Sequence, residues 1–136
     1  ARDKGVSLGL VIAGEGPEKE YLTKLVEVSG IGENVVFLPW TNDVVSLYQS
    51  ADLYLLTSHF EGFGRTLAEA AYLGRPIIST DVGIAREVGA LISGYDAEDL
   101  AVKIENVVSG RIQPKTCYNL LAQTEYFNKL KNSFTK

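Results

Sequence analysis

Two glutamates, Glu61 and Glu69, lie eight positions apart in the segment EGFGRTLAE, around a turn that contains two glycines. The apolar run 53–57 before this segment predicts a buried strand, and the spacing of apolar residues after Gly64 predicts a helix. A helix start leaves backbone N–H groups unpaired and carries partial positive charge, so it can hold a phosphate. Carboxylates accept hydrogen bonds from hydroxyl groups. The segment therefore suits a phosphorylated, hydroxyl-rich ligand.

The turn offers this ligand both space and hydrogen-bond donors. Glycine has no side chain, so Gly62 and Gly64 would let the ligand approach the backbone closely. The N–H groups expected to face a phosphate are those of Gly64, Arg65, Thr66 and Leu67. The plain alternative is that this turn only joins a strand to a helix, with Glu69 favoured near the helix start by the dipole.

Strand-like and helix-like segments alternate along the rest of the chain, which is typical of a parallel sheet covered by helices. The expected strands are 7–13, 34–38, 53–57, 76–79 and 90–93. The expected helices are 17–29, 44–49, 65–73 and 96–108, followed by an amphipathic helix over 115–134. That last helix is expected either to cross onto the other domain or to pack on its own domain. Ligands of such a sheet lie beyond the carboxyl ends of its strands.

The loops at those strand ends carry motifs whose order resembles the donor-binding segment of family-4 retaining glycosyltransferases. The matches are VIAGEGP at 11–17, VFLPW at 36–40, TSHFEGFG at 57–64, LAEA at 67–70, LGRPIIST at 73–80, and DVG at 81–83 with Glu87. Such enzymes have the GT-B architecture of two facing Rossmann-like domains. The resemblance therefore implies a Rossmann-like parallel sheet with helices on both faces, as in the C-terminal half of a GT-B fold. One departure is that the family's paired glycines after the strand 76–79 appear here as Val82-Gly83-Ile84.

The resemblance implies a role for each loop. Glu61 is expected to be the catalytic residue, at the hydroxyls of the transferred sugar, and Glu69 is expected to bind the two ribose hydroxyls. The other expected donor-binding residues are Gly62, Phe63, Gly64, Arg65, Thr66 and Leu67 on the turn, and Gly14, Gly16, Leu38, Trp40 and His59 around it.

Four of these residues also have plain structural readings. Gly14 and Gly16 could form a tight turn with Pro17 at the first helical position. Trp40 could pack in a half-buried site. His59 could form only local hydrogen bonds in its loop.

The function implied is the donor-binding part of a retaining glycosyltransferase that moves a hexosyl group from a UDP- or GDP-sugar to an acceptor. Front-side displacement is expected, with helix-start N–H groups stabilising charge on the leaving diphosphate. The nucleotide sugar is the expected partner, and no metal or other cofactor is expected. Two alternatives stay open: a GT-B nucleotide-sugar epimerase, and a non-catalytic nucleotide-sugar-binding or interaction module.

Family members open this domain with a strand and a helix whose Arg and Lys grip the donor's diphosphate, and the sequence shows no such element. We therefore expect the first strand, most of the first helix and an N-terminal acceptor-binding domain to be missing. Residues 1–110 are expected to form the truncated donor domain, and residues 111–136 a C-terminal amphipathic helix. Such a fragment is expected to bind donor weakly and to transfer nothing.

Bulk properties narrow the class of protein. A chain of 136 residues is long enough for one domain. Its net charge of -4 argues against nucleic acid as a partner. The sequence shows no membrane-spanning run and no signal peptide. A cytoplasmic location is expected, with any peripheral membrane contact made through the missing domain. Cys117 is the sole cysteine, so no internal disulfide can form.

Overall fold

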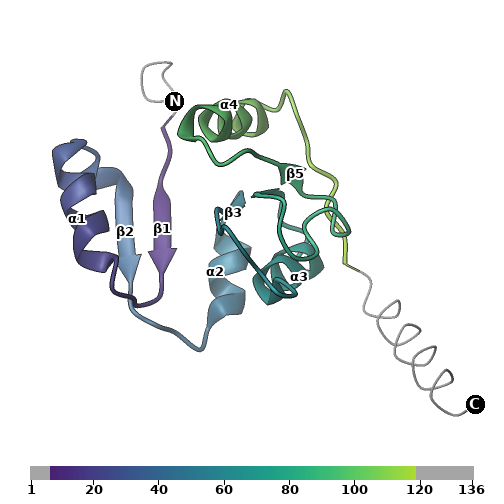
Figure 1. The fold of residues 1–136 in the computed structure, drawn as a ribbon, viewed down its shortest axis with the longest axis horizontal. Coiled ribbons are helices and arrows are strands. Elements are labelled where there is room, and N and C mark those ends of the chain that lie inside the picture. The colour runs from purple at the N-terminus through teal and green to yellow at the C-terminus, as the bar shows by residue number, and fades with distance from the viewer. Residues whose placement is uncertain (1–6, 119–136) are drawn as a thin grey trace, which may run out of the picture. The chain divides into compact units, whose positions relative to one another are not determined.

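The computed structural model describes residues 7–118, and its elements fall into two compact units whose boundary lies between Val44 and Val45 (Figure 1). In both units the strands are parallel. A helix connects the first two strands of each unit, and turns over residues 83–89 lie between the last two strands of the second. A parallel pair needs a crossover because the chain must return to the same end of the sheet. The alternation predicted from the sequence is confirmed.

The first unit contains two strands and one helix. Strand β1 (Leu10–Ala13) pairs in parallel with β2 (Val35–Leu38). Helix α1 (Lys19–Val28) and a 3₁₀ turn (Gly32–Asn34) connect them. The N–H of Gly14 donates to the carbonyl of Leu38 at 3.0 Å, so the loop after β1 leaves the sheet where the ladder ends.

The second unit contains a three-stranded sheet. Its strands are β3 (Tyr54–Leu56), β4 (Ile77–Ser79) and β5 (Leu91–Ile92), and its helices are α2 (Val44–Ser50), which begins at the unit boundary, α3 (Arg65–Tyr72) and α4 (Ala97–Val108). The strand order is β3-β4-β5, and both pairings are parallel. Tyr54 lies opposite Ile77, and Ile78 lies opposite Leu91.

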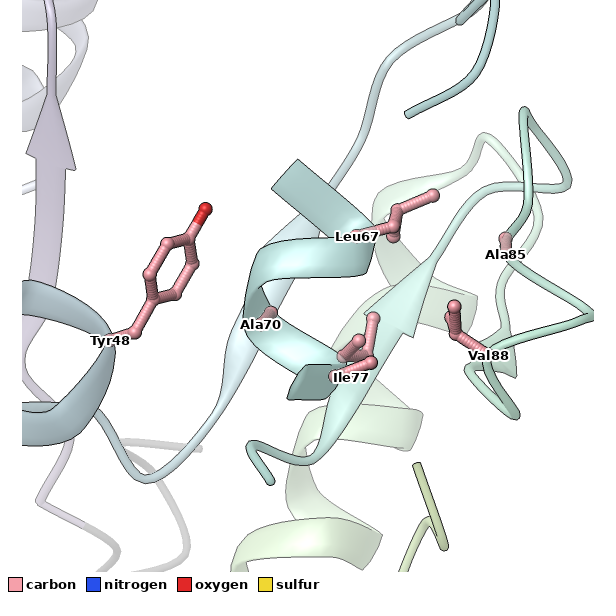
Figure 2. Close-up of a cluster of buried hydrophobic side chains, with 7 residues drawn as sticks. Tyr48, Leu67, Ala70, Ile77, Ala85 and Val88 are labelled. Carbon is pink, nitrogen blue, oxygen red and sulfur yellow. The ribbon is translucent and has the colours of Figure 1, made fainter. Parts of the chain in front are cut away.

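The core of the second unit forms around the central strand β4, whose three residues are all buried. Figure 2 shows the side chains that meet there, from α2, α3, β4 and the segment after β4. They are Tyr48, Leu67, Ala70, Ala71, Ile77, Ala85 and Val88. The alanines of α3 expose little surface and place no bulk between the helix and the sheet, which suits close packing.

The ends of the helices follow local rules. The side chain of Asp96 accepts the N–H of Asp99 at 2.7 Å and so caps α4, as its residue type predicts. Gly74 ends α3 with a φ of +68°, a left-handed conformation that glycine adopts readily. Both ends agree with the sequence prediction.

Several expected boundaries are corrected. Every strand is shorter than predicted, and α1 begins at Lys19. On α2, Val44 is exposed, whereas Tyr48 is buried.

The helix predicted over 115–134 lies mostly outside the described residues. Its first four residues are not helical. They run beside the segment after Ala85, where the N–H of Cys117 donates to the carbonyl of Val88 at 3.1 Å. This bond holds Cys117 beside Val88, and the predicted helix does not begin at residue 115. The expected division at residue 110 stays a prediction.

Candidate functional site

Three loops gather at the carboxyl edge of the sheet in the second unit. They are residues 57–64 after β3, residues 80–84 after β4 and residues 93–96 after β5. Because the strands are parallel and adjacent, these loops emerge at the same edge (Figure 1). The turn that carries Glu61 is therefore the first of three neighbouring loops.

The loop after β4 holds this turn closely. The hydroxyl of Thr80 donates to the carbonyl of Ser58 at 2.6 Å, and the N–H of Ile84 donates to the carbonyl of Phe63 at 3.0 Å. Gly83 has a φ of +50°, and a Cβ built on it would lie 2.5 Å from the Phe63 oxygen. Only glycine allows this approach. Gly83 is not among the predicted site residues, although the DVG motif was the available signal.

The carboxylate of Glu61 is oriented within its own loop. The hydroxyl of Ser58 donates to Oε1 of Glu61 at 2.9 Å, and the Glu61 side chain is half-buried. The second carboxylate oxygen carries no hydrogen bond from the described residues. Ser58 is a second residue that the sequence prediction left out of the site, although a hydroxyl three positions before a glutamate was a local signal.

Glu69 lies at the start of the second turn of α3, with both carboxylate oxygens occupied. The phenol of Tyr48 donates to Oε2 at 3.2 Å, and Nε of Arg65 donates to Oε1 at 2.8 Å. Each carboxylate oxygen has a further lone pair, so Glu69 can still accept two hydroxyl groups. The side chain of Arg65 is 89% exposed, so its ion pair adds little stability.

Tyr54, on β3, lies within the electrostatic reach of both glutamates. Burial raises the pKa of Tyr54, and the negative charges of Glu61 and Glu69 raise it further. Tyr48 packs edge-to-face against Tyr54, with ring centres 5.4 Å apart. Burial, followed by the charges of Tyr54 and Glu69, raises the pKa of Tyr48 as well. Both phenols therefore stay protonated at neutral pH, and the fold brings the two carboxylates around one tyrosine.

The start of α3 offers three N–H groups rather than four. Gly64 adopts a left-handed conformation with a φ of +82°, and its carbonyl accepts the N–H of Leu67 at 2.9 Å. The side chain of Leu67 is fully buried. Leu67 is therefore a core residue, and its expected role as a donor to the ligand is corrected. The N–H groups of Gly64, Arg65 and Thr66 have no acceptor among the described residues.

Four predicted residues lie in the first unit, at the carboxyl ends of its two strands. Gly14 and Leu38 are joined by the hydrogen bond between their backbones, and the carbonyl of Gly16 accepts the N–H of Lys19 at 3.2 Å. Trp40 is 68% exposed, so it does not pack into the core of this unit.

His59 lies on the rim of a small cavity in the second unit. The cavity has a volume of about 180 Å³, and residues from all three loops line it, including Thr57, Thr80 and Ser93. The imidazole stacks on the ring of Tyr95, with centres 4.8 Å apart and planes 11° from parallel. His59 thus both lines a cavity and makes a specific ring contact. Tyr95 is another residue that the sequence did not mark for the site.

Asp99 fixes the loop between β5 and α4. Its Oδ2 accepts the N–H of Gly94 at 2.7 Å and the hydroxyl of Ser93 at 3.1 Å, and its Oδ1 accepts from Lys103. The Lys103 ammonium, together with these hydrogen bonds, lowers the pKa of the Asp99 carboxyl. The ionised carboxylate therefore holds the loop in place.

We expect the Asp99→Asn variant to lose less stability in acid than the unmodified chain. A carboxyl whose folded pKa is depressed stabilises the fold above its unfolded pKa, about 3.9, and this contribution is lost as the pH falls through the folded pKa. Urea unfolding at several pH values below about 4.5 would measure it. Parallel stability curves for the two proteins over this range would contradict the assignment.

The described residues include neither a cluster of metal ligands nor a membrane-spanning helix. Between residues 7 and 118, no group of three or more His, Cys, Asp or Glu side chains is placed to hold a metal ion. None of the helices in that range has the length and apolar character needed to cross a membrane.

Sequence comparison relates most of the chain to known proteins. Residues 2–122 match the family model described as glycosyl transferases group 1. The chain is 32% identical over 123 residues to a D-inositol 3-phosphate glycosyltransferase of Rhodococcus opacus (strain B4), covering 80% of the chain and 27% of that protein. It is 38% identical over 108 residues to the uncharacterized glycosyltransferase MJ1607 of Methanocaldococcus jannaschii, covering 74% of the chain and 28% of that protein. The chain thus spans under a third of the length of these curated relatives.

Solved structures share the fold. The lipopolysaccharide outer core galactosyltransferase WaaB in its apo form superposes with a TM-score of 0.76 at 25% identity, over 92% of this chain and 41% of that one. Anabaena HepE in complex with UDP superposes with a TM-score of 0.69 at 25% identity, over 80% of this chain and 33% of that one.

Proposed function

Because the chain belongs to the glycosyl transferases group 1 family, we propose that it is the donor-binding part of a retaining glycosyltransferase that transfers a hexosyl group from a nucleotide-diphosphate sugar. Its Rossmann-like fold is that of the C-terminal half of a GT-B enzyme, as predicted. The predicted enzyme class rests on this membership. The donor, the stereochemistry and the roles of individual residues are the proposal.

The observation that carries the proposal is the placement of three groups around the start of α3. Along the chain, Glu61 precedes the helix start and has one carboxylate oxygen that no described residue occupies, and Glu69 follows it with lone pairs available. Between them, the N–H groups of residues 64–66 have no acceptor among the described residues. A nucleotide sugar presents the hydroxyls of the ribose, then the negative charge of the diphosphate, then the hydroxyls of the hexose. A carboxylate suits each set of hydroxyls, and the helix-start N–H groups suit the diphosphate.

Uridine diphosphate is the first nucleotide to consider. The HepE structures contain UDP, alone or with glucose. In our proposal Glu69 accepts the ribose hydroxyls, the helix start faces the diphosphate, and Glu61 accepts hydroxyls of the hexose. The donor contacts that the sequence predicts for Gly14, Gly16, Leu38 and Trp40, in the first unit, stay a prediction.

The proposed reaction is a front-side displacement at the anomeric carbon. The bond between that carbon and the diphosphate oxygen breaks, and the acceptor oxygen bonds to the same face of the sugar. The acceptor's proton passes to the departing diphosphate. In this proposal the helix-start N–H groups stabilise the negative charge that grows on the diphosphate, and Arg65 adds a positive charge. No protein-bound metal takes part in this proposal.

We propose that a second domain holds the acceptor, since the chain spans only 27–28% of relatives such as those named above. The protein is expected to be cytoplasmic, and that domain would make any contact with a membrane.

Titration with UDP, GDP and ADP tests the proposal. We expect one of these nucleotides to shift the NMR signals of residues 61–69 in the 136-residue chain. A sugar carried by that same nucleotide should then serve as donor for the full-length protein. No shift at millimolar concentrations of any nucleotide would contradict the donor site. Binding without transfer by the full-length protein would favour a non-catalytic module, and interconversion of nucleotide sugars would favour an epimerase.

A further inference from the structure

The stacked pair of His59 and Tyr95 joins two loops that are not neighbours in the sheet. His59 follows β3 and Tyr95 follows β5, and β4 lies between these strands. The contact therefore spans the end of the central strand. A centre separation of 4.8 Å with nearly parallel planes lies within the range in which aromatic rings attract each other.

Hydrogen bonds fix the backbone on both sides of Tyr95. Asp99 binds the two residues before Tyr95, through the hydroxyl of Ser93 and the N–H of Gly94, and it is itself bound by Lys103. Asp96, directly after Tyr95, caps α4. Both sides of Tyr95 are thus anchored by hydrogen bonds, although the residue is 60% exposed.

On the other side of the stack, His59 directly follows the residue that orients Glu61. The hydroxyl of Ser58 donates to Glu61 at 2.9 Å, and the carbonyl of Ser58 accepts the hydroxyl of Thr80 at 2.6 Å. His59 and Ser58 are adjacent in the chain, so a stack that fixes the His59 side chain restricts the loop that carries the Ser58 hydroxyl. The stack therefore acts on the carboxylate of Glu61 without touching it.

We propose that Tyr95 is a positioning residue, which holds Glu61 in its reactive orientation by stacking on His59. This inference rests on the proposed function, since it assumes that Glu61 faces the transferred sugar. It assigns the loop between β5 and α4 a part in the transfer step. A contact of this strength corresponds to an effect of about 2- to 10-fold on rate.

The kinetic test uses the full-length protein and three variants. Tyr95→Ala is expected to lower kcat by about 2- to 10-fold and to leave the Kd of the nucleotide unchanged, whereas Tyr95→Phe keeps the ring and is expected to retain kcat. Tyr72→Ala is the matched control, because Tyr72 is 63% exposed and makes no ring contact with the described residues. Equal kcat values for Tyr95→Ala and Tyr72→Ala would overturn the proposal.

A double-mutant cycle tests the route through His59. If Tyr95 acts by stacking, Tyr95→Ala should have no further effect on kcat in a His59→Ala background. In the full chain, Tyr95→Ala should also shift the NMR signals of the His59 ring and of the Glu61 backbone, with no nucleotide present. Additive kinetic effects, or unchanged Glu61 signals, would refute the coupling. If instead the unmodified protein neither binds nucleotide nor transfers sugar, the proposed function fails, and the NMR comparison still decides whether the stack orients Glu61.

Discussion

Replacing Gly83 with alanine is expected to open the candidate site and to abolish detectable nucleotide binding. Alanine in the left-handed region costs about 1–2 kcal/mol, and the added Cβ would lie 2.5 Å from the Phe63 oxygen. The obstacle is backbone, so the turn at Phe63 and Gly64 must move away. The hydrogen bond from Ile84 to Phe63 would then be lost. We expect the free energy of unfolding to fall by about 2–4 kcal/mol in total.

Gly74→Ala separates the clash from the backbone strain. Gly74 has a φ of +68°, close to that of Gly83, but a Cβ there meets nothing within 4 Å. We therefore expect this control to lose only about 1–2 kcal/mol and to keep nucleotide binding. Urea denaturation and calorimetric titration of both variants would measure the two effects. A Gly83→Ala variant that binds nucleotide as well as Gly74→Ala does would show that the two loops need not touch.

The second large effect is expected for Glu69→Ala, which should weaken nucleotide binding by about 10- to 100-fold, the equivalent of losing one hydrogen bond to a charged group, about 1.5–3 kcal/mol. Folding should suffer less. The Tyr48 phenol loses its bond to Glu69 but lies 3.4 Å from the carbonyl of Thr66, which can accept it. Calorimetry with UDP or GDP, together with thermal unfolding, would separate the two results.

Glu20→Ala is the control for the loss of an ion pair. Glu20 and Lys24 form a helical pair at 2.8 Å with the same spacing as Arg65 and Glu69. Removing it breaks an equivalent contact on α1 and is expected to leave nucleotide affinity unchanged. If Glu69→Ala binds nucleotide as tightly as Glu20→Ala, then Glu69 does not touch the ribose.

The features that could be predicted from the sequence are those set by residues close together in the chain. Asp96 and Gly74 end helices through contacts within a few positions, and the glycine-flanked turn before α3 has the same local origin. The existence of the strands also followed from short apolar runs. Their exact ends did not, because pairing with the neighbouring strand decides how far each ladder extends.

The contacts that complete the site join distant positions, and no local pattern reports them. Tyr48 reaches Glu69 across 21 positions, and Thr80 reaches Ser58 across 22. Tyr95 meets His59 only because β5 lies beside β4 in the sheet. For Leu67 the sequence predicted one role too many. It was expected to be an apolar residue of the helix and also to donate its N–H to the ligand, but the residue is fully buried, and only the first role fits.

The first unit has a further property that concerns its motion. None of its described residues is buried, whereas every buried residue between positions 7 and 118 belongs to the second unit. Segments with few buried contacts open at low free energy, so the amide hydrogens of β1 and β2 should exchange with solvent faster than those of β4. A ligand held by Gly14 and Leu38 would have to order this unit, and the entropy lost in doing so would reduce its affinity.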